Sequence, residues 1–218
     1  MTSTVRIIGG AWRRLHLPIA PVEGLRPSPD RVRETLFNWL GQDCTGWSVL
    51  DLFAGTGALG FEAASRGASE VCFVESNKLA AQQLRLNVEK LHQNTSSGKS
   101  GDVAPSPAPK LQVQQADVGP WLAQKHSQPQ SRFDLVFADP PFRSDWMDKI
   151  LPHIAKLVQP GGIIYLEWSE CLFDQVPRKG VEPTANALAD RMKIAKIDAL
   201  RYLKAGQVHA HLVGIPAL

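Results

Sequence analysis

The sequence predicts an α/β fold: a mostly parallel, Rossmann-like sheet with helices on both faces. Short apolar runs alternate along the chain with longer segments whose apolar residues recur at helical spacing, as expected for strands joined by helical crossovers. One apolar run ends at Asp51 and passes through closely spaced glycines into a helical pattern. The chain finishes with two extended runs, 193–203 and 207–215, which predict an antiparallel hairpin at one edge of the sheet.

The first element is a small hairpin formed by strands at 5–10 and 14–19, joined by two glycines. Trp12, Arg13 and Arg14 decorate this ribbon, where aromatic and basic side chains together can stack on bases and bind phosphates. The alternative, with equal weight, is that Trp12 packs the hairpin onto the main domain.

A helix is expected over 31–41, because apolar residues recur there at helical spacing and a glycine follows as a stop. Ser28 or Asp30 is its expected N-terminal cap. Arg31 and Arg33 stand at the helix start, where cations oppose the helix dipole. We therefore interpret these two arginines as a response to an anionic ligand.

The net charge of +3 lies entirely in residues 1–40, which contain six arginines and three acidic residues, whereas the remainder of the chain is neutral. Arginine suits phosphate because its planar guanidinium offers two parallel hydrogen bonds. A nucleic-acid interface and an ordinary solvated surface are both compatible with this cluster.

A strand, a tight turn and a helix over 58–66 follow. The turn carries glycines at the G-x-G-x-x-G spacing: Gly55, Gly57 and Gly60. The next strand, 70–75, ends at Glu75, at the separation from the glycines that is expected of a ribose-binding carboxylate. This pattern predicts an adenosine-type ligand without saying which one.

The remaining elements continue the alternation. They are a helix over 77–92, strands over 111–117 and 132–139, a helix over 145–158 and a strand over 161–168. The segment 93–109 is rich in Ser, Gly and Pro, and it predicts a mobile surface insertion inside the domain.

Four acidic residues stand at or near the ends of successive predicted strands: Asp51, Glu75, Asp117 and Asp139. Ligands of such sheets bind beyond the carboxyl ends of the strands, which makes these acids candidate binding residues. Any single one of them could instead cap a helix.

The composition excludes several other classes. No apolar run approaches the roughly 20 residues that span a bilayer, and no apolar signal core precedes the first strand. The three cysteines, Cys44, Cys72 and Cys171, form no metal pattern and no disulfide framework. We expect a cytoplasmic protein without a metal, with Cys72 as a core residue.

The segment Asp139-Pro140-Pro141-Phe142 carries the chemistry. Two consecutive prolines remove two N–H donors, so their carbonyls and the Asp139 carboxylate form a rigid corner of acceptors. Such a corner suits an amino group on a base, and Phe142 offers a ring on which the base can stack. Holding the amine against acceptors localises its lone pair and makes it a nucleophile.

These residues resemble a known family. Asp-Pro-Pro-Phe is similar to the fourth motif of class I S-adenosylmethionine-dependent methyltransferases that act on exocyclic amino groups, and Asp51–Gly60, Glu75 and Asp117 match their first three motifs. The resemblance narrows to the RsmD family, which methylates N2 of a guanine in small-subunit (16S) ribosomal RNA. The segments that carry it are 6–10, 26–27, 30–40, 51–57 and 205–208.

The resemblance implies a seven-stranded sheet with an antiparallel last strand, S-adenosylmethionine as cofactor, and small-subunit ribosomal RNA, free or in an assembling 30S particle, as partner. Implied catalytic residues are Asp139, Pro140, Pro141 and Phe142. Implied cofactor-binding residues are Asp51, Phe53, Gly55, Thr56, Gly57, Glu75, Ser76, Asp117 and Asp139. Candidate RNA-binding residues are Arg6, Trp12, Arg13, Arg14, Arg26, Arg31 and Arg33.

We expect a monomer without a membrane segment, divided into an RNA-binding hairpin extension at 1–24 and a methyltransferase domain at 25–218. Three alternatives stay open. An adenine-N6 methyltransferase also fits Asp-Pro-Pro-Phe. An NAD-dependent oxidoreductase fits the glycines and Glu75. A non-enzymatic RNA-binding module fits the arginines.

Overall fold

The computed structural model describes residues 3–97, 107–126, 132–141, 145–177 and 183–217. The chain forms two compact units, Met1–Val118 and Gly119–Leu218. The expected hairpin extension belongs to the first unit, so the predicted boundary after residue 24 does not coincide with this division.

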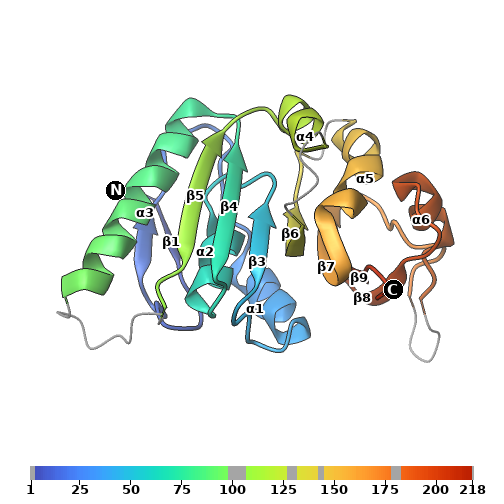
Figure 1. The fold of residues 1–218 in the computed structure, drawn as a ribbon, viewed down its shortest axis with the longest axis horizontal. Helices are drawn as coiled ribbons and strands as arrows, with labels where there is room; N and C mark the ends of the chain where they lie inside the picture. The colour runs from blue at the N-terminus through green and yellow to red at the C-terminus, as the bar shows by residue number, and fades with distance from the viewer. Residues whose placement is uncertain (1–2, 98–106, 127–131, 142–144, 178–182, 218) are drawn as a thin grey trace. The chain divides into compact units, whose positions relative to one another are not determined.

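The first unit is built on three parallel strands in the order β5-β4-β3: β3 (Ser48–Asp51), β4 (Glu70–Glu75) and β5 (Lys110–Gln115). Helix α2 (Ala58–Ser65) packs on β3 and β4, and α3 (Lys78–Ser97) runs along β4 and β5 (Figure 1). Every side chain from Val71 to Val74 is buried. Because successive side chains of a strand point to opposite faces, both faces of β4 are covered.

The N-terminal hairpin is present, as predicted. Strand β1 (Thr4–Arg6) pairs antiparallel with β2 (His16–Pro18), and the buried side chains of Val5 and Leu17 lie opposite each other. The side chain of Trp12 is only 6% exposed, so it packs into the unit and offers no open face to a base. This corrects the expectation that Trp12 binds RNA and favours the packing alternative.

Helix α1 (Asp30–Trp39) begins after Pro29 without a side-chain cap, so the expected cap by Ser28 or Asp30 is wrong. Asp30 instead lies in the first turn, where its carboxylate binds Arg6 (2.7 Å) and Arg33 (2.6 Å). Burial raises the pKa of this carboxyl, but the hydrogen bond from Arg6 and the charge of Arg33 outweigh that effect and lower the pKa.

Arg33 is a structural residue. Its guanidinium is 1% exposed and donates to the carboxylates of Asp30 and Glu62 and to the carbonyls of Arg6 and Ser28. The anionic partners of Arg33 are therefore two carboxylates of the protein itself. The expectation that Arg33 binds RNA phosphate is corrected on this ground.

The fully buried carboxylate of Glu62, on α2, is the centre of this network. It accepts from Arg33 (3.3 Å) and Arg66 (2.8 Å), and from the backbone N–H groups of Ile8 (2.8 Å) and Gly9 (2.7 Å). One side chain thus joins the hairpin, α1 and α2. A buried charge with these partners is stable in place, whereas one without them is strongly unfavourable.

The second unit has four strands in the order β6-β7-β9-β8: β6 (Phe133–Ala138), β7 (Val158–Trp168), β8 (Asp198–Ala205) and β9 (Val208–Gly214). Strands β6 and β7 are parallel, and β9 is antiparallel to both of its neighbours. Helix α5 (Trp146–Leu157) packs on β6 and β7. With three strands in one unit and four in the other, the mostly parallel α/β fold with an antiparallel last strand is confirmed.

Two helices have no counterpart in the sequence-based expectation: α4 (Val118–His126) and α6 (Asn186–Met192). Helix α3 also continues to Ser97, five residues into the segment expected as an insertion at 93–109. Residues 98–106 of that segment lie outside the described residues.

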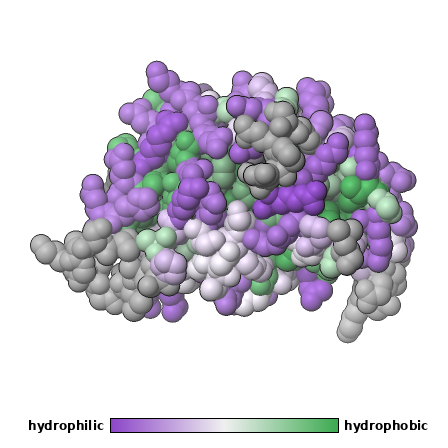
Figure 2. All heavy atoms as spheres, viewed as in Figure 1, coloured by the Kyte–Doolittle hydropathy of each residue, from purple (hydrophilic) through white to green (hydrophobic). Residues whose placement is uncertain are grey.

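The face shown in Figure 2 carries hydrophilic side chains over much of its area, with apolar surface between them. In the described ranges no helix is long and apolar enough to cross a membrane. Leu79 and Leu86, both on α3, are among the large apolar side chains that are exposed.

Replacing Glu62 with Ala should lower the free energy of unfolding by about 3–5 kcal/mol, because the buried guanidinium of Arg66 loses the carboxylate that pairs with it and Arg33 loses one of two. Urea denaturation measures this change. The matched control is Glu70→Ala on β4, whose ion pair with Lys110 is exposed and whose loss should change stability by less than about 1 kcal/mol. Equal effects of the two substitutions would contradict a central role for Glu62.

Candidate active site

The turn after β3 contains glycines at positions where neighbouring side chains leave no room for a Cβ atom. Gly57 has φ +75° and stands directly before α2. A Cβ on Gly57 would lie 2.5 Å from the ring of Phe61, and one on Gly60 would lie 2.3 Å from the ring of Phe73. Both distances are too short for any side chain, so the turn keeps its path only with glycine at these positions.

Asp51, the last residue of β3, is 3% exposed, and its Oδ2 accepts the backbone N–H of Gly60 at 3.0 Å. Burial raises the pKa of this carboxyl to about 7, the Gly60 hydrogen bond opposes the rise, and the charge of Glu75 adds to it. A cation bound nearby would favour the ionised form and lower the pKa again.

Glu75, the last residue of β4, joins the glycine turn to the start of α3. Its Oε2 accepts the N–H of Gly55 at 2.8 Å, and its Oε1 accepts the N–H of Asn77 at 2.6 Å. A carboxylate has about four acceptor positions, so each oxygen keeps capacity for a hydroxyl donor.

Asn77 is a residue that the sequence-based expectation missed. Its Oδ1 accepts the N–H groups of Leu79 (2.9 Å) and Ala80 (3.1 Å), which caps the first turn of α3, while its own N–H holds Glu75. The signal that could have found it is an asparagine between a strand end and an apolar-periodic helix.

Asp117 lies two residues beyond β5 and is exposed. The N–H of the preceding Ala116 donates to the carbonyl of Glu75 at 3.0 Å, which holds the ends of β5 and β4 together. Asp51, Glu75 and Asp117 therefore stand at the carboxyl ends of three adjacent parallel strands, as predicted. We call these three carboxylates the acidic rim.

The other expected cofactor residues of this unit differ in exposure. Thr56 is buried in the glycine turn, Phe53 is half-buried, and Ser76 is exposed just after β4.

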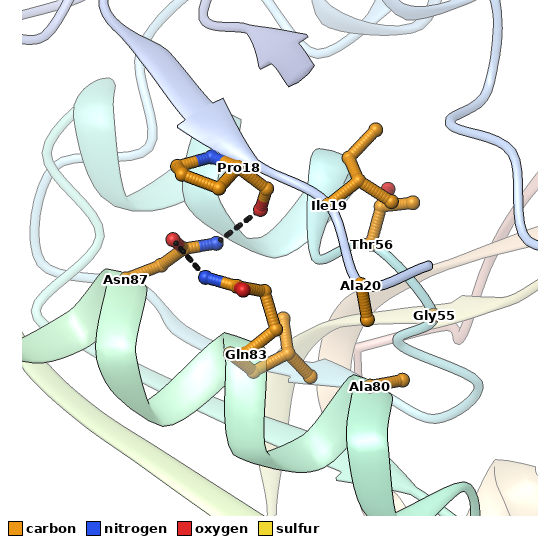
Figure 3. A pocket seen from close by; sticks show the side chains of 9 residues that line it. Pro18, Ile19, Ala20, Gly55, Thr56, Ala80, Gln83 and Asn87 are labelled. Atoms are coloured by element: carbon orange, nitrogen blue, oxygen red, sulfur yellow. Dashed lines mark hydrogen bonds between the residues drawn. The ribbon is translucent and has the colours of Figure 1, made fainter. Parts of the chain in front are cut away.

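A segment from the N-terminal hairpin also lies against the glycine turn (Figure 3). Residues 18–20 line a small pocket together with Gly55 and Thr56 on one side and α3 on the other. The amide of Asn87, on α3, donates to the carbonyl of Pro18 at 3.0 Å and accepts from Gln83 at 3.1 Å. The hairpin is therefore anchored beside the expected cofactor turn.

In the second unit, Asp139 follows β6 directly and is half-buried, Pro140 is buried and Pro141 is exposed. Phe142 lies outside the described residues. The hydroxyl of Tyr165, on β7, donates to the buried Glu167 at 2.6 Å. Burial raises the pKa of Tyr165, and the negative charges of Glu167 and Asp139 raise it further, so Tyr165 stays a donor.

Five of the arginines expected to bind RNA have exposed side chains: Arg6, Arg13, Arg14, Arg26 and Arg31. All five belong to the first unit, which also carries the acidic rim. Of these, Arg6 is engaged with Asp30 and yet half exposed.

Comparisons with known proteins agree with this geometry. Residues 5–178 match the family described as Conserved hypothetical protein 95. Ribosomal RNA small subunit methyltransferase D of Haemophilus influenzae is 40% identical over 165 residues, which are 75% of this chain and 78% of that protein.

Solved structures share the fold. A methyltransferase-like protein from Escherichia coli superposes with a TM-score of 0.71 at 33% identity, over 99% of this chain and 100% of that one. The Thermus thermophilus 16S ribosomal RNA N2 G1207 methyltransferase, in complex with AdoMet and guanosine, gives a TM-score of 0.61 at 22% identity. That match covers 98% of this chain and 50% of the other, and at this identity it bears on the fold alone.

The buried carboxyl of Asp51 makes stability depend on pH. Its pKa is 3.8 in an exposed setting and about 7 here, so the folded state holds the proton more tightly and loses stability as pH rises from about 4 to about 7. Asp51→Asn removes this loss, and at pH 7 it should exceed the parent stability by about 1 kcal/mol or more.

Urea denaturation of both proteins across this pH window measures the difference. The control is Asp43→Asn, because hydrogen bonds from Thr45 lower the pKa of Asp43 and its contribution is constant over the window. Parallel stability curves for Asp51→Asn and the parent would refute the assignment.

Proposed function

The chain belongs to the family described as Conserved hypothetical protein 95, the RsmD family, and from that premise we propose its reaction. It transfers a methyl group from S-adenosylmethionine to the exocyclic N2 amine of a guanine in small-subunit ribosomal RNA. The observation that carries the proposal is the acidic rim beside the glycine turn. The other unit of the chain holds the acceptor corner, which consists of the Asp139 carboxylate and the carbonyls of the two prolines after it.

The residues of the first unit fit S-adenosylmethionine. Glu75 has free acceptor capacity for ribose hydroxyls, and Asp117 suits the adenine amine. Asp51 suits the positively charged methionine end, because a cation there relieves the energetic cost that its raised pKa reports. The N-terminus of α2 directs backbone N–H groups toward a carboxylate, and the exposed Leu79 offers apolar surface for a purine.

When bound, the cofactor supplies an electrophilic methyl group on a sulfonium. The protein supplies orientation: the Asp139 carboxylate and the Pro140 carbonyl accept the two N–H bonds of the guanine amine, and Phe142 stacks on the base. A strong base is not required, because the amine becomes acidic once it is methylated. The rate comes from positioning and from preorganised acceptors.

The exposed arginines of the first unit supply the contacts to RNA phosphates, so affinity should fall as salt rises. Their position on the unit that holds the acidic rim supports an RNA substrate. We place the reaction in the cytoplasm, on free RNA or in an assembling 30S particle, with the chain acting as a monomer.

The buried carboxyl of Asp51 predicts a ligand preference. S-adenosylhomocysteine should raise the melting temperature of the protein and NADH should not, because Asp51 beside the glycine turn suits the positively charged amine of the methionine end, whereas the pyrophosphate of NADH would bring further negative charge to it. Glu75→Ala should weaken S-adenosylhomocysteine binding about tenfold or more, since two hydroxyls lose their acceptor. Thermal-shift titration measures both effects.

Glu70→Ala, at the other end of β4, is the matched control and should bind the ligand like the parent. Stabilisation by NADH alone would sink the methyltransferase proposal in favour of the oxidoreductase alternative.

Asp139→Ala should lower methyl transfer about 100-fold or more while S-adenosylhomocysteine still binds, because the carboxylate acts on the amine rather than on the cofactor. Transfer of radiolabelled methyl groups to small-subunit RNA, followed by nucleoside analysis for N2-methylguanosine, measures this. Asp198→Ala, an aspartate in an exposed ion pair with Lys196, should retain parent activity. Full activity of Asp139→Ala would overturn the assigned role.

A further inference from the structure

A second hollow of the first unit lies away from the acidic rim. It is an open groove of about 500 Å³, a size in the range of small-ligand sites. The hairpin turn forms one wall with Gly9, Gly10 and Arg13, the exposed side of α1 forms another with Asn38, and Gln42 and Arg66 complete it. We call this hollow the hairpin groove.

The charge around the hairpin groove is unbalanced. A chain of ion pairs reaches the groove and runs from Arg6 through Asp30, Arg33 and Glu62 to Arg66, with Arg6 and Asp30 about half exposed and the other three side chains buried. Its final cation, Arg66, lines the groove. The Arg66 side chain is 6% exposed and pairs with Glu62 at 2.8 Å, so it lines the groove from a fixed position.

Arg13 adds a second cation to the lining. No carboxylate of the described residues lies within ion-pair distance of its exposed guanidinium. Glu34 contributes the single negative charge of the lining, so a bound phosphate would meet two guanidinium groups and one carboxylate.

The wall formed by the hairpin turn is held rigidly. A Cβ on Gly9 would lie 2.2 Å from the guanidinium of Arg66, and one on Gly10 would lie 1.9 Å from the carbonyl of Ser65. The carbonyl of Ser65 also accepts a hydrogen bond from the backbone N–H of Ala11 at 2.7 Å. The two glycines therefore let the turn press against the end of α2 and set the width of the groove.

Two side-chain amides line the groove, that of Asn38 on α1 and that of Gln42, which lies beyond the end of α1. Gln42 donates to Asn38 and accepts from Arg66, so the amides and the guanidinium form one hydrogen-bonded row. Gln42 has φ +69°, a left-handed conformation that glycine or asparagine normally occupies after a helix. A glutamine kept at a strained position indicates a use for its side chain.

The lining thus combines guanidinium groups, which bind phosphate, with amides, which hydrogen-bond the edges of bases. We propose that the hairpin groove binds one nucleotide of single-stranded RNA, distinct from the guanine that is methylated. Its phosphate meets Arg13 and Arg66, and its base meets Asn38 and Gln42. Single-stranded RNA is the class that fits, because the deep, narrow major groove of an RNA duplex keeps side chains from the base edges, whereas unpaired bases present them openly. The assignment rests on the proposed function in taking RNA as the substrate.

Fluorescence anisotropy with a labelled single-stranded RNA octamer of mixed sequence, and with an abasic octamer of equal length, tests the groove without cofactor. Arg13→Ala should weaken binding of both probes about tenfold and reduce the salt slope by about 1. Asn38→Ala should weaken only the octamer with bases, by about three- to tenfold, and leave the salt slope unchanged. The charge control is Arg85→Ala, an exposed arginine of α3 outside the groove, which should change affinity less than about twofold.

Gln42→Gly distinguishes a role of this side chain in RNA binding from a role in stability. Glycine relaxes the left-handed position, so the melting temperature should stay equal or rise while affinity for the octamer with bases falls. A purely structural glutamine would not lower affinity in a protein of unchanged or higher melting temperature.

Two outcomes would overturn the assignment. If the parent binds and methylates RNA but Asn38→Ala and Gln42→Gly bind both probes like the parent, the groove is not a nucleotide site and the proposed function stands. If the parent binds neither the octamer nor small-subunit RNA, the RNA substrate itself is wrong and the groove assignment falls with it.

Discussion

The buried carboxylate of Glu62 is the interaction on which the first unit depends. It holds two guanidinium groups and two backbone N–H groups, from three elements that are far apart in the sequence. A carboxylate can stay buried only while these partners remain, so the hairpin, α1 and α2 are ordered together. The N-terminal segment is thereby a fixed wall of the unit and not a loose arm.

The same constraint connects the hairpin to the chemistry. With the hairpin held on α2, its following residues lie against the glycine turn, where Asn87 fastens Pro18. The turn itself is held by Glu75 through Gly55. The segment expected to meet RNA and the rim expected to meet the cofactor therefore belong to one rigid set of contacts, which is what transfer between two substrates requires.

The arginines of the first unit differ in burial and therefore in role. Arg33 and Arg66 neutralise Glu62 inside the unit, while Arg13 stays exposed at the surface. The buried Arg66 pairs with Glu62 and also lines the hairpin groove. The groove lining thus holds two guanidinium groups, that of Arg66, which pairs with Glu62, and that of Arg13, which is exposed.

The sequence by itself determined the fold class, the order of the strands along the chain, and the acids that end β3, β4 and β5. These features depend on local periodicity and on glycine spacing, which a linear pattern contains. It did not determine which arginine is buried, because the partner of Arg33 lies 29 residues away and becomes its neighbour only when α1 packs on α2. Only the tertiary structure decided that Arg33 and Trp12 belong to the interior, since burial of a charge or a ring depends on long-range contacts that no local pattern records.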